Sequence, residues 1–172
     1  MKRTPFAAMS CPIARGLDRV GEWWSILILR DALQGLTRFD EFERSLGIAP
    51  NMLARRLAGL VDGGLMEKRA YSERPRRYDY VLTERGRDFR EVVQALLAWG
   101  NRHFAPEGPS MLIVDRTTGL AAEPILVDSV SGKSLADPIF EIRPGPALGS
   151  RGLARQALIA AARVRHEAES RS

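Results

Sequence analysis

The chain of 172 residues is poor in the residue types that build disulfides and metal centres. Its single cysteine, Cys11, excludes an internal disulfide framework and any multi-cysteine zinc site. Two histidines, His103 and His166, leave little from which to assemble a metal centre. We therefore expect no metal and no cofactor, and we expect the protein in a reducing cytoplasm.

Long apolar runs are also missing. The longest strongly apolar stretch, residues 23–29, is far shorter than the ~20 residues that a membrane-spanning helix needs. Lys2 and Arg3 are not followed by the apolar segment of a secretory signal. The sequence therefore predicts no membrane contact.

Catalytic motifs are absent as well. The sequence contains no G-x-G-x-x-G, no Walker loop and no H-E-x-x-H, and neither histidine has the partners of a Ser/His/Asp set. We expect no enzymatic activity.

Lysine is scarce, whereas arginine is abundant. Only three of the 26 basic residues are lysines, and the pI is about 10.0. Residues 1–105 hold 18 basic and 13 acidic residues, but residues 106–172 hold eight of each. Because the arginine fork forms paired hydrogen bonds with phosphates and base edges, this bias favours nucleic acid as a partner.

Apolar residues at helical spacing predict four helices in the first third of the chain. The first begins at Pro12, a residue favoured at the first helical position. The second is apolar almost all round, which is typical of a helix in a core. The second helix is predicted at about residues 22–33 and the third from residues 37–39 to the stop at Gly47. The fourth begins at Pro50 or Asn51 and is terminated by Gly63-Gly64.

A hairpin and a long helix are predicted next. Alternating apolar and polar residues predict strands at 65–71 and 77–82 around a turn at 72–76. Thr83 is an N-cap candidate for one long helix. Its apolar stripe, residues 89–99, is wider than one small domain needs.

The remainder contains an internal repeat. The sequence Asp115-Arg116-Thr117-Thr118-Gly119 is echoed by Asp128-Ser129-Val130-Ser131-Gly132, which predicts two turns between short strands at 111–114, 124–127 and 138–143. This part is too small to bury much apolar surface alone. We predict a domain at 1–105, a β-rich extension at 106–146, and a linker with an Ala-rich helix or tail at 147–172.

These elements predict a mainly α fold with a small β-hairpin (α+β): a winged helix-turn-helix with a small β-rich C-terminal extension. On a helical wheel, Leu57 and Leu60 lie within about 40° of Leu53, and Asn51 and Arg55 lie opposite. Asn pairs with adenine and Arg with guanine in the major groove, so both are candidate base contacts. Alternatively, the arginines of this helix only solvate an exposed face.

The hairpin has a basic tip with Arg74, Arg76 and Arg77, which would reach phosphates or the minor groove if the hairpin is a wing. The alternative is that charge on a hairpin only discourages strand-to-strand aggregation. The candidate contacts to the DNA backbone or grooves are Thr37, Arg38, Met52, Arg56, Ser72, Arg74, Arg76 and Arg77.

Residues 11–104 resemble the HxlR-type bacterial transcriptional regulators, a winged-helix group related to MarR. The resemblance implies a homodimer, formed through the first and last helices, on a near-palindromic operator, as repressor or activator. The implied dimer residues are Ile13, Leu17, Phe89, Val93, Leu96 and Trp99. The matching segments are 11–15, 24–30, 38–42, 48–57, 64–65, 80–86 and 99–100.

Two further expectations follow from the resemblance. The extension is similar to a zinc ribbon found in some relatives, but Thr118 and Ser131 stand where cysteines precede the turn glycines, so we expect a degenerate, metal-free ribbon. Family members sense oxidants or electrophiles through a cysteine near Cys11, which makes Cys11 a candidate redox sensor. Alternatively, Cys11 only packs at the dimer interface.

Two functions remain open from the sequence. The first is a DNA-binding transcriptional regulator that binds double-stranded DNA as a homodimer and responds to an unidentified small molecule or oxidant. The second is a protein-interaction module on a winged-helix scaffold that no longer binds DNA.

Overall fold

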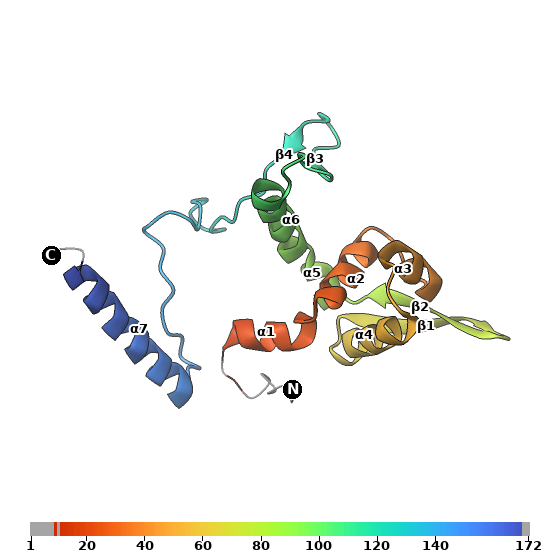
Figure 1. Cartoon of the computed structure of the whole chain (residues 1–172), viewed down its shortest axis with the longest axis horizontal. Coiled ribbons are helices and arrows are strands. Elements are labelled where there is room, and N and C mark those ends of the chain that lie inside the picture. Colours follow the sequence, from red (N-terminus) through yellow and green to blue (C-terminus); the bar gives the residue numbers. More distant parts are fainter. Residues whose placement is uncertain (1–8, 10, 170–172) are drawn as a thin grey trace. The chain divides into compact units, whose positions relative to one another are not determined.

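The computed structural model describes residue 9 and residues 11–169. They divide into two compact units, one formed by residues 22–137 and the other by the residues before and after it. Helices dominate and one long hairpin is present, so the predicted fold class is confirmed (Figure 1). Among the described residues, no helix combines the length and apolar composition needed to span a bilayer.

The core of the first unit lies between three helices: α2 (Trp23–Leu33), α3 (Phe39–Leu46) and α4 (Pro50–Asp62). Each contributes apolar residues at helical spacing, as the sequence predicts. Ile28, Leu29, Phe42, Leu53 and Leu57 are completely buried. Burial of these side chains provides the main stabilisation of this unit.

A buried carboxylate joins α2 to α3. Asp31, which is 5% exposed, accepts a hydrogen bond from Ser45 Oγ at 2.7 Å and another from Arg30 Nε at 2.8 Å. Both carboxylate oxygens therefore have partners, as a buried charge requires. This contact fixes the position of α3 on the core.

The hairpin consists of β1 (Met66–Glu73) and β2 (Arg76–Leu82), paired antiparallel. Glu73 pairs with Arg76, so the turn is shorter than the predicted 72–76. The strand limits predicted at residues 71 and 77 were therefore wrong at the tip. The backbone near Arg38 forms a bridge to Asp79 and pairs with the hairpin like a short third strand.

Gly86 is closely packed at the junction between the hairpin and the following helix. Thr83 caps that helix by accepting a hydrogen bond from Gly86 N at 3.1 Å, and its hydroxyl donates to the Gly64 carbonyl at 2.8 Å. A Cβ on Gly86 would overlap the carbonyl oxygen of Leu65. Only glycine allows this approach.

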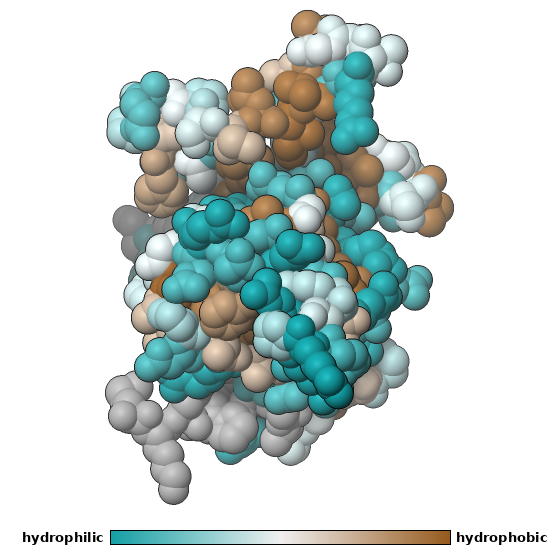
Figure 2. Space-filling view, turned by 90° about the vertical axis from the view of Figure 1, so that its right-hand side faces the viewer, coloured by the Kyte–Doolittle hydropathy of each residue, from teal (hydrophilic) through white to brown (hydrophobic). Residues whose placement is uncertain are grey.

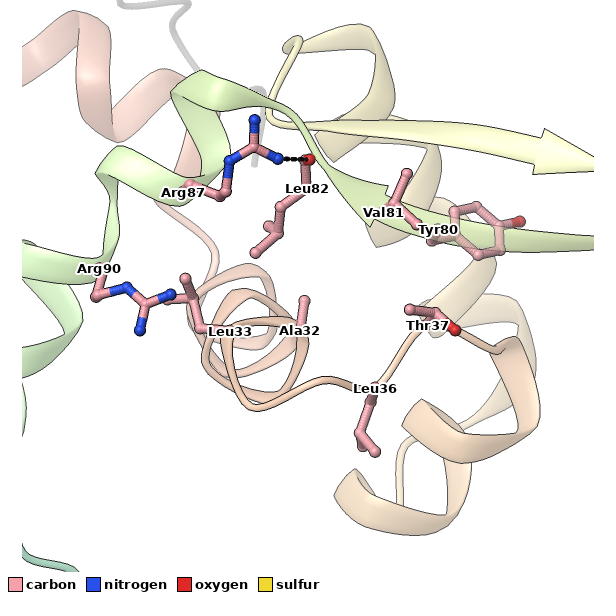
Figure 3. Close-up of a pocket in the computed structure, with 9 residues that line it drawn as sticks. All are labelled: Ala32, Leu33, Leu36, Thr37, Tyr80, Val81, Leu82, Arg87 and Arg90. Carbon is pink, nitrogen blue, oxygen red and sulfur yellow. Dashed lines mark hydrogen bonds between the residues drawn. The ribbon is translucent and has the colours of Figure 1, made fainter. Parts of the chain in front are cut away.

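The single long helix predicted after Thr83 is wrong: the structure has α5 (Glu84–Asp88) and α6 (Arg90–Phe104), separated at Phe89. The physical reason is that the two pieces pack on different partners, α5 on β2 and α6 on α2. A cavity of about 240 Å³ lies at this junction, with Arg87 and Arg90 beside it (Figure 3).

Residues 109–137, called the paired-turn segment below, contain both predicted turns. Gly119 and Gly132 adopt the left-handed conformation at corresponding places, with φ of 73° and 69°. Strands β3 (Ile113–Val114) and β4 (Ala121–Ala122) flank the first turn. Residues 124–127 form only a bridge from Val127 to Ser134.

The strand predicted at 138–143 is also wrong. Residues 138–139 form a turn. Pro138 lacks the N–H that a strand ladder needs. Each turn of the paired-turn segment pairs with its own flanks, so no third strand is recruited.

The second unit contains α1 (Pro12–Val20) and α7 (Ser150–Glu169). The predicted start of the first helix at Pro12 is confirmed, and the Ala-rich stretch is helical. The domain limits placed after residues 105 and 146 stay a prediction.

Candidate nucleic-acid interface

A short turn orients α4 relative to α3. Gly47 ends α3 in the left-handed conformation, with φ of 60°, and its N–H donates to the Glu43 carbonyl at 2.9 Å. The buried side chain of Ile48 follows, and Pro50 occupies the first turn of α4. Two helices joined by a short turn that begins with a glycine have the geometry of a helix-turn-helix.

The outer face of α4 is polar and open. Leu53 and Leu57 are completely buried beneath it, whereas Asn51 and Arg55 are exposed. The Arg55 guanidinium donates a weak hydrogen bond to Met52 Sδ at 3.5 Å. Ala54, Ala58 and Gly59 are exposed and small, so the helix offers little steric barrier to close approach.

Arg56, a candidate contact to the DNA backbone or grooves, forms an ion pair within the protein. Its guanidinium forms an ion pair with Glu22 at 3.0 Å, and its side chain is only 18% exposed. Its Nε is buried without a hydrogen-bond partner among the described residues. Arg56 thus connects α4 to the start of α2 instead of standing free on the α4 surface.

The hairpin carries an exposed basic tip. Arg74, Arg76 and Arg77 are all exposed, and no carboxylate of the described residues lies within ion-pair distance of them. Ser72, the partner of Arg77 in the β-ladder, is half-buried. Three unpaired guanidiniums on one tip produce a positive potential that attracts phosphate.

Aromatic rings hold further cations on the hairpin. Lys68 Nζ lies 3.8 Å from the centroid of the Tyr78 ring, and Arg76 Cζ lies 5.5 Å from the same centroid. Arg38 Cζ lies 4.8 Å from the centroid of the Tyr71 ring. These are cation–π contacts, which position the charges without neutralising them. Sequence reasoning did not assign Lys68, Tyr71 or Tyr78 to the site, because the contact of Lys68 with Tyr78 depends on strand pairing and that of Tyr71 with Arg38 joins distant parts of the chain.

The start of α3 borders the same surface. Thr37 Oγ1 hydrogen-bonds to Asp79 at 3.1 Å, and Arg38 lies 3.9 Å from that carboxylate. A groove of about 500 Å³ separates α3 from the hairpin. It is lined by Phe39, Asp40, Tyr71, Arg76, Arg77, Tyr78 and Tyr80.

Glu41 closes the N-terminus of α3. Its carboxylate accepts hydrogen bonds from the backbone N–H groups of Arg38 at 2.9 Å and Thr37 at 3.0 Å. These bonds favour the charged form and lower the pKa of Glu41. The ionised carboxylate thereby fixes the loop that carries Thr37 and Arg38.

The predicted dimer residues are distributed over both units. On α1, Ile13 is 71% and Leu17 is 45% exposed. On α6, Leu96 and Trp99 are about half-exposed and Val93 is more covered, as is Phe89 at the break before α6. Val93 lines an apolar groove of about 410 Å³ between α2 and α6. Val92, which is 52% exposed, is missing from the predicted dimer residues. Together with Leu96 and Trp99 it forms an exposed apolar row, called the outer stripe of α6 below.

Cys11 is partly exposed at the N-cap of α1. Its carbonyl accepts a hydrogen bond from Arg15 N at 3.1 Å. Elsewhere in the described part of the chain, no group of three His, Cys, Asp or Glu side chains is arranged to hold a metal ion. Thr118 and Ser131 occupy the two turns of the paired-turn segment, where each bonds locally.

Known proteins share this arrangement. Residues 19–108 match the model of the HxlR-like helix-turn-helix family. An HTH-type transcriptional regulator of Mycobacterium tuberculosis, Rv3095, is 38% identical over 135 residues, which are 78% of this chain and 85% of that protein. The HTH-type regulator YdeP of Bacillus subtilis is 31% identical over 94 residues, 54% of this chain and 73% of YdeP.

Solved structures extend the likeness to three dimensions. A candidate transcription factor of Pseudomonas aeruginosa, PA1374, is 54% identical, with a TM-score of 0.62, over 84% of this chain and 99% of its own. A second candidate transcription factor, PA1607, is 38% identical with a TM-score of 0.73, over 83% and 100%. The reduced form of the redox regulator HypR is 30% identical with a TM-score of 0.51, over 56% and 99%.

The predicted resemblance is thus confirmed by three independent kinds of likeness: a family model, relatives in sequence and solved folds. The chain belongs to the HxlR-like helix-turn-helix family and is a transcriptional regulator with a DNA-binding fold.

Proposed function

We propose that this regulator binds a near-palindromic operator as a homodimer and reads its sequence through α4. The observation that carries the proposal is the open polar face of α4 beside a hairpin whose arginine-rich tip lacks ion-pair partners among the described residues. A helix with small exposed residues fits the floor of the major groove, and a basic hairpin fits the flanking backbone.

Base reading is assigned to Asn51 and Arg55. Both lie within the first two turns of α4 and are exposed. In helix-turn-helix proteins it is the N-terminal part of the recognition helix that contacts base edges. Asn51 has the groups to pair with adenine and Arg55 those to pair with guanine. Met52, half-buried beside Arg55, contributes apolar contact at the groove.

Backbone contacts are assigned to the wing. Arg74, Arg76 and Arg77 reach phosphates or the minor groove, and Ser72 supports their strand. Thr37 and Arg38 contribute from the base of the wing, where Asp79 orients both. Phosphate contacts supply affinity and register, while base contacts supply specificity.

Arg56 receives a different role from the one predicted. Because it is paired with Glu22, we assign it to positioning: it holds α4 against the start of α2. An ion pair of this kind, largely withdrawn from solvent, fixes a helix direction more than it attracts DNA.

The homodimer is assigned to the outer stripe of α6 together with α1. Val92, Leu96 and Trp99 expose apolar surface on α6, and Ile13 and Leu17 do so on α1. Exposed apolar stripes of this kind mark interaction surfaces. A two-fold pair would place two α4 helices in successive major grooves, one helical turn apart.

Selection of duplexes from a random library by the full chain tests the proposal. We expect enrichment of a two-fold sequence whose half-sites lie about 10 base pairs apart, the spacing of one helical turn. Failure to enrich any sequence, together with no gel shift at micromolar protein, would contradict it. That outcome would favour the alternative of a protein-interaction module that has lost DNA binding.

Redox control through Cys11 is a second proposed property. A structural neighbour, HypR, is named a redox regulator, and Cys11 is partly exposed at the N-cap of α1. With one cysteine per chain, a peroxide would join two chains: two thiols are oxidised to one disulfide as the peroxide is reduced to water. Loss of DNA binding on peroxide treatment, abolished in Cys11→Ser, would support this role; identical behaviour of both proteins would contradict it.

A further inference from the structure

The paired-turn segment exposes apolar surface that its own fold does not cover. None of the residues 109–137 is buried. A stable unit of this size normally needs a covered apolar face or a metal. Its large apolar side chains with 47–93% exposure are Met111, Leu112, Val114, Leu120, Ile125, Leu126, Val127, Val130 and Leu135.

Local hydrogen bonds nevertheless give the segment a defined shape. The Asp115 carboxylate accepts a hydrogen bond from Thr117 N at 2.7 Å, and the Asp128 carboxylate accepts hydrogen bonds from Ser131 Oγ at 2.6 Å and from Ser131 N at 2.9 Å. These bonds favour ionisation, so the pKa of each aspartate is lowered. The exposed apolar residues are therefore carried on ordered turns.

The paired-turn segment contacts the C-terminal end of α6 through a hydrogen bond and an ion pair. Asn101 Nδ2 donates a hydrogen bond to the Met111 carbonyl at 2.9 Å, and Arg102 pairs with Glu123. The outer stripe of α6 thus continues toward Met111 and Leu112. Figure 2 shows apolar side chains gathered at the height that α6 and the paired-turn segment have in Figure 1, while the region of the wing is mainly hydrophilic.

The scarcity of charged side chains in the paired-turn segment indicates that a second copy of the chain covers its apolar surface. A two-fold interface brings the same patch from both copies face to face, so the patch must tolerate its own copy. Residues 117–122 and 124–127 contain no charged side chain. An apolar patch is self-complementary, whereas a nucleic acid would require basic residues, and the segment has only Arg116 and Lys133.

The available area points the same way. On α6, the exposed parts of the aromatic residues Trp99 and Phe104 amount to roughly 200–300 Å², since an aromatic side chain buries about 150–250 Å², and Val92 and Leu96 add about half of a smaller side chain each. A stable interface buries about 800 Å² per partner. The paired-turn segment supplies the missing apolar area next to the α6 stripe.

We propose that the paired-turn segment is a docking surface for a second copy of this chain, which extends the proposed dimer surface on α6 beyond the winged helix. The inference rests on the proposed homodimer. Comparison with shorter relatives is consistent with an added element: the match to reduced HypR covers 99% of that protein but only 56% of this chain, whereas PA1374 and PA1607 match 84% and 83%.

Sedimentation equilibrium of the full chain without DNA tests the inference. Leu126→Glu and Ile125→Glu place a charge on residues that are 61% and 68% exposed, so each chain should keep its helical circular dichroism. We expect each to raise the dimer Kd by about tenfold or more, as burial of an unpaired charge at an interface does. The matched control, Arg116→Glu, brings the same side chain to an exposed polar position and should leave Kd within about twofold.

A reference variant, Trp99→Glu on α6, distinguishes a failure of the docking surface from a failure of the proposed homodimer. Suppose that Trp99→Glu weakens the dimer and the two segment variants do not. The α6 dimer then stands, and the docking role of the segment is overturned. An equal effect of Arg116→Glu would overturn it too, because charge rather than apolar contact would then be responsible. A wild-type chain that stays monomeric would overturn both the homodimer and the inference.

Discussion

The winged-helix part and the paired-turn segment of one chain are held together by different forces. The former surrounds completely buried residues such as Phe42, Leu53 and Leu57. The latter has no buried residue and relies on hydrogen bonds to Asp115 and Asp128. The difference teaches that apolar residues alone do not make a core: burial needs elements that pack against one another, and a segment without them leaves its apolar side chains exposed.

The largest expected difference between the two regions is in the loss of unfolding free energy when one leucine of each is truncated to alanine. Leu57→Ala removes a completely buried side chain and should lower the free energy of unfolding by about 2–5 kcal/mol. Leu126→Ala removes a side chain that is 61% exposed and should change it by about 0.5 kcal/mol or less. Urea unfolding, at a protein concentration where the chain is monomeric, measures both. Equal losses would show that the segment shares the core.

Two arginines of the winged-helix part should affect DNA binding differently. Arg55→Ala should cost about 1–3 kcal/mol of discrimination at one position in each half-site, because it removes a base contact. Arg76→Ala should weaken binding to every sequence alike and lower the salt slope by roughly one unit, because it removes a phosphate contact. Titration of the selected operator and of a random duplex at several salt concentrations measures both effects.

The matched control is Arg116→Ala in the paired-turn segment, which should change neither quantity. Equal loss of affinity for operator and random duplex in the Arg55 and Arg76 variants would contradict the separation of base reading from backbone contact.

Acid should loosen the paired-turn segment before the winged-helix part. Hydrogen bonds lower the pKa of Asp115 and Asp128 below 3.8, so their stabilisation is present above that pH and is lost as the pH falls through the lowered values. Glu41 follows the same sign, but the apolar core around Phe42 does not titrate. Amide exchange of Thr117 and Ser131 should accelerate relative to that of Leu57 as the pH falls below about 3.8. Parallel acceleration at all three amides would contradict this order.

Local sequence signals determine most of the winged helix. Pro12, Pro50 and the left-handed Gly47 lie at helix ends, as propensity predicts. Period-3.6 spacing of Leu53 and Leu57 predicts which face of α4 is buried, and thereby places Asn51 and Arg55 outside. These features depend on neighbours a few residues away, so the sequence contains them directly.

Contacts between distant residues were not predictable. Glu22 and Arg56 are 34 positions apart, and no local pattern distinguishes a paired arginine from a free one. The break at Phe89 arises because α5 and α6 pack on different elements, although helix propensity continues through it. Lys68 and the Tyr78 ring become neighbours through the β-ladder, and Arg38 and Tyr71 are 33 positions apart in the sequence.

Cleavage of DNA from a reagent tethered to α4 tests the central claim most directly. The variant Ala54→Cys, made in a Cys11→Ser background, places a single thiol at an exposed position of α4 next to Arg55 in the sequence and keeps both Asn51 and Arg55. With an iron chelate attached, we expect cleavage of the selected operator at one place in each half-site. The matched variant Asp62→Cys, at the far end of α4, should cut more weakly. Uniform cleavage along the duplex, or equal cleavage from both positions, would contradict the placement of the first turns of α4 in the major groove.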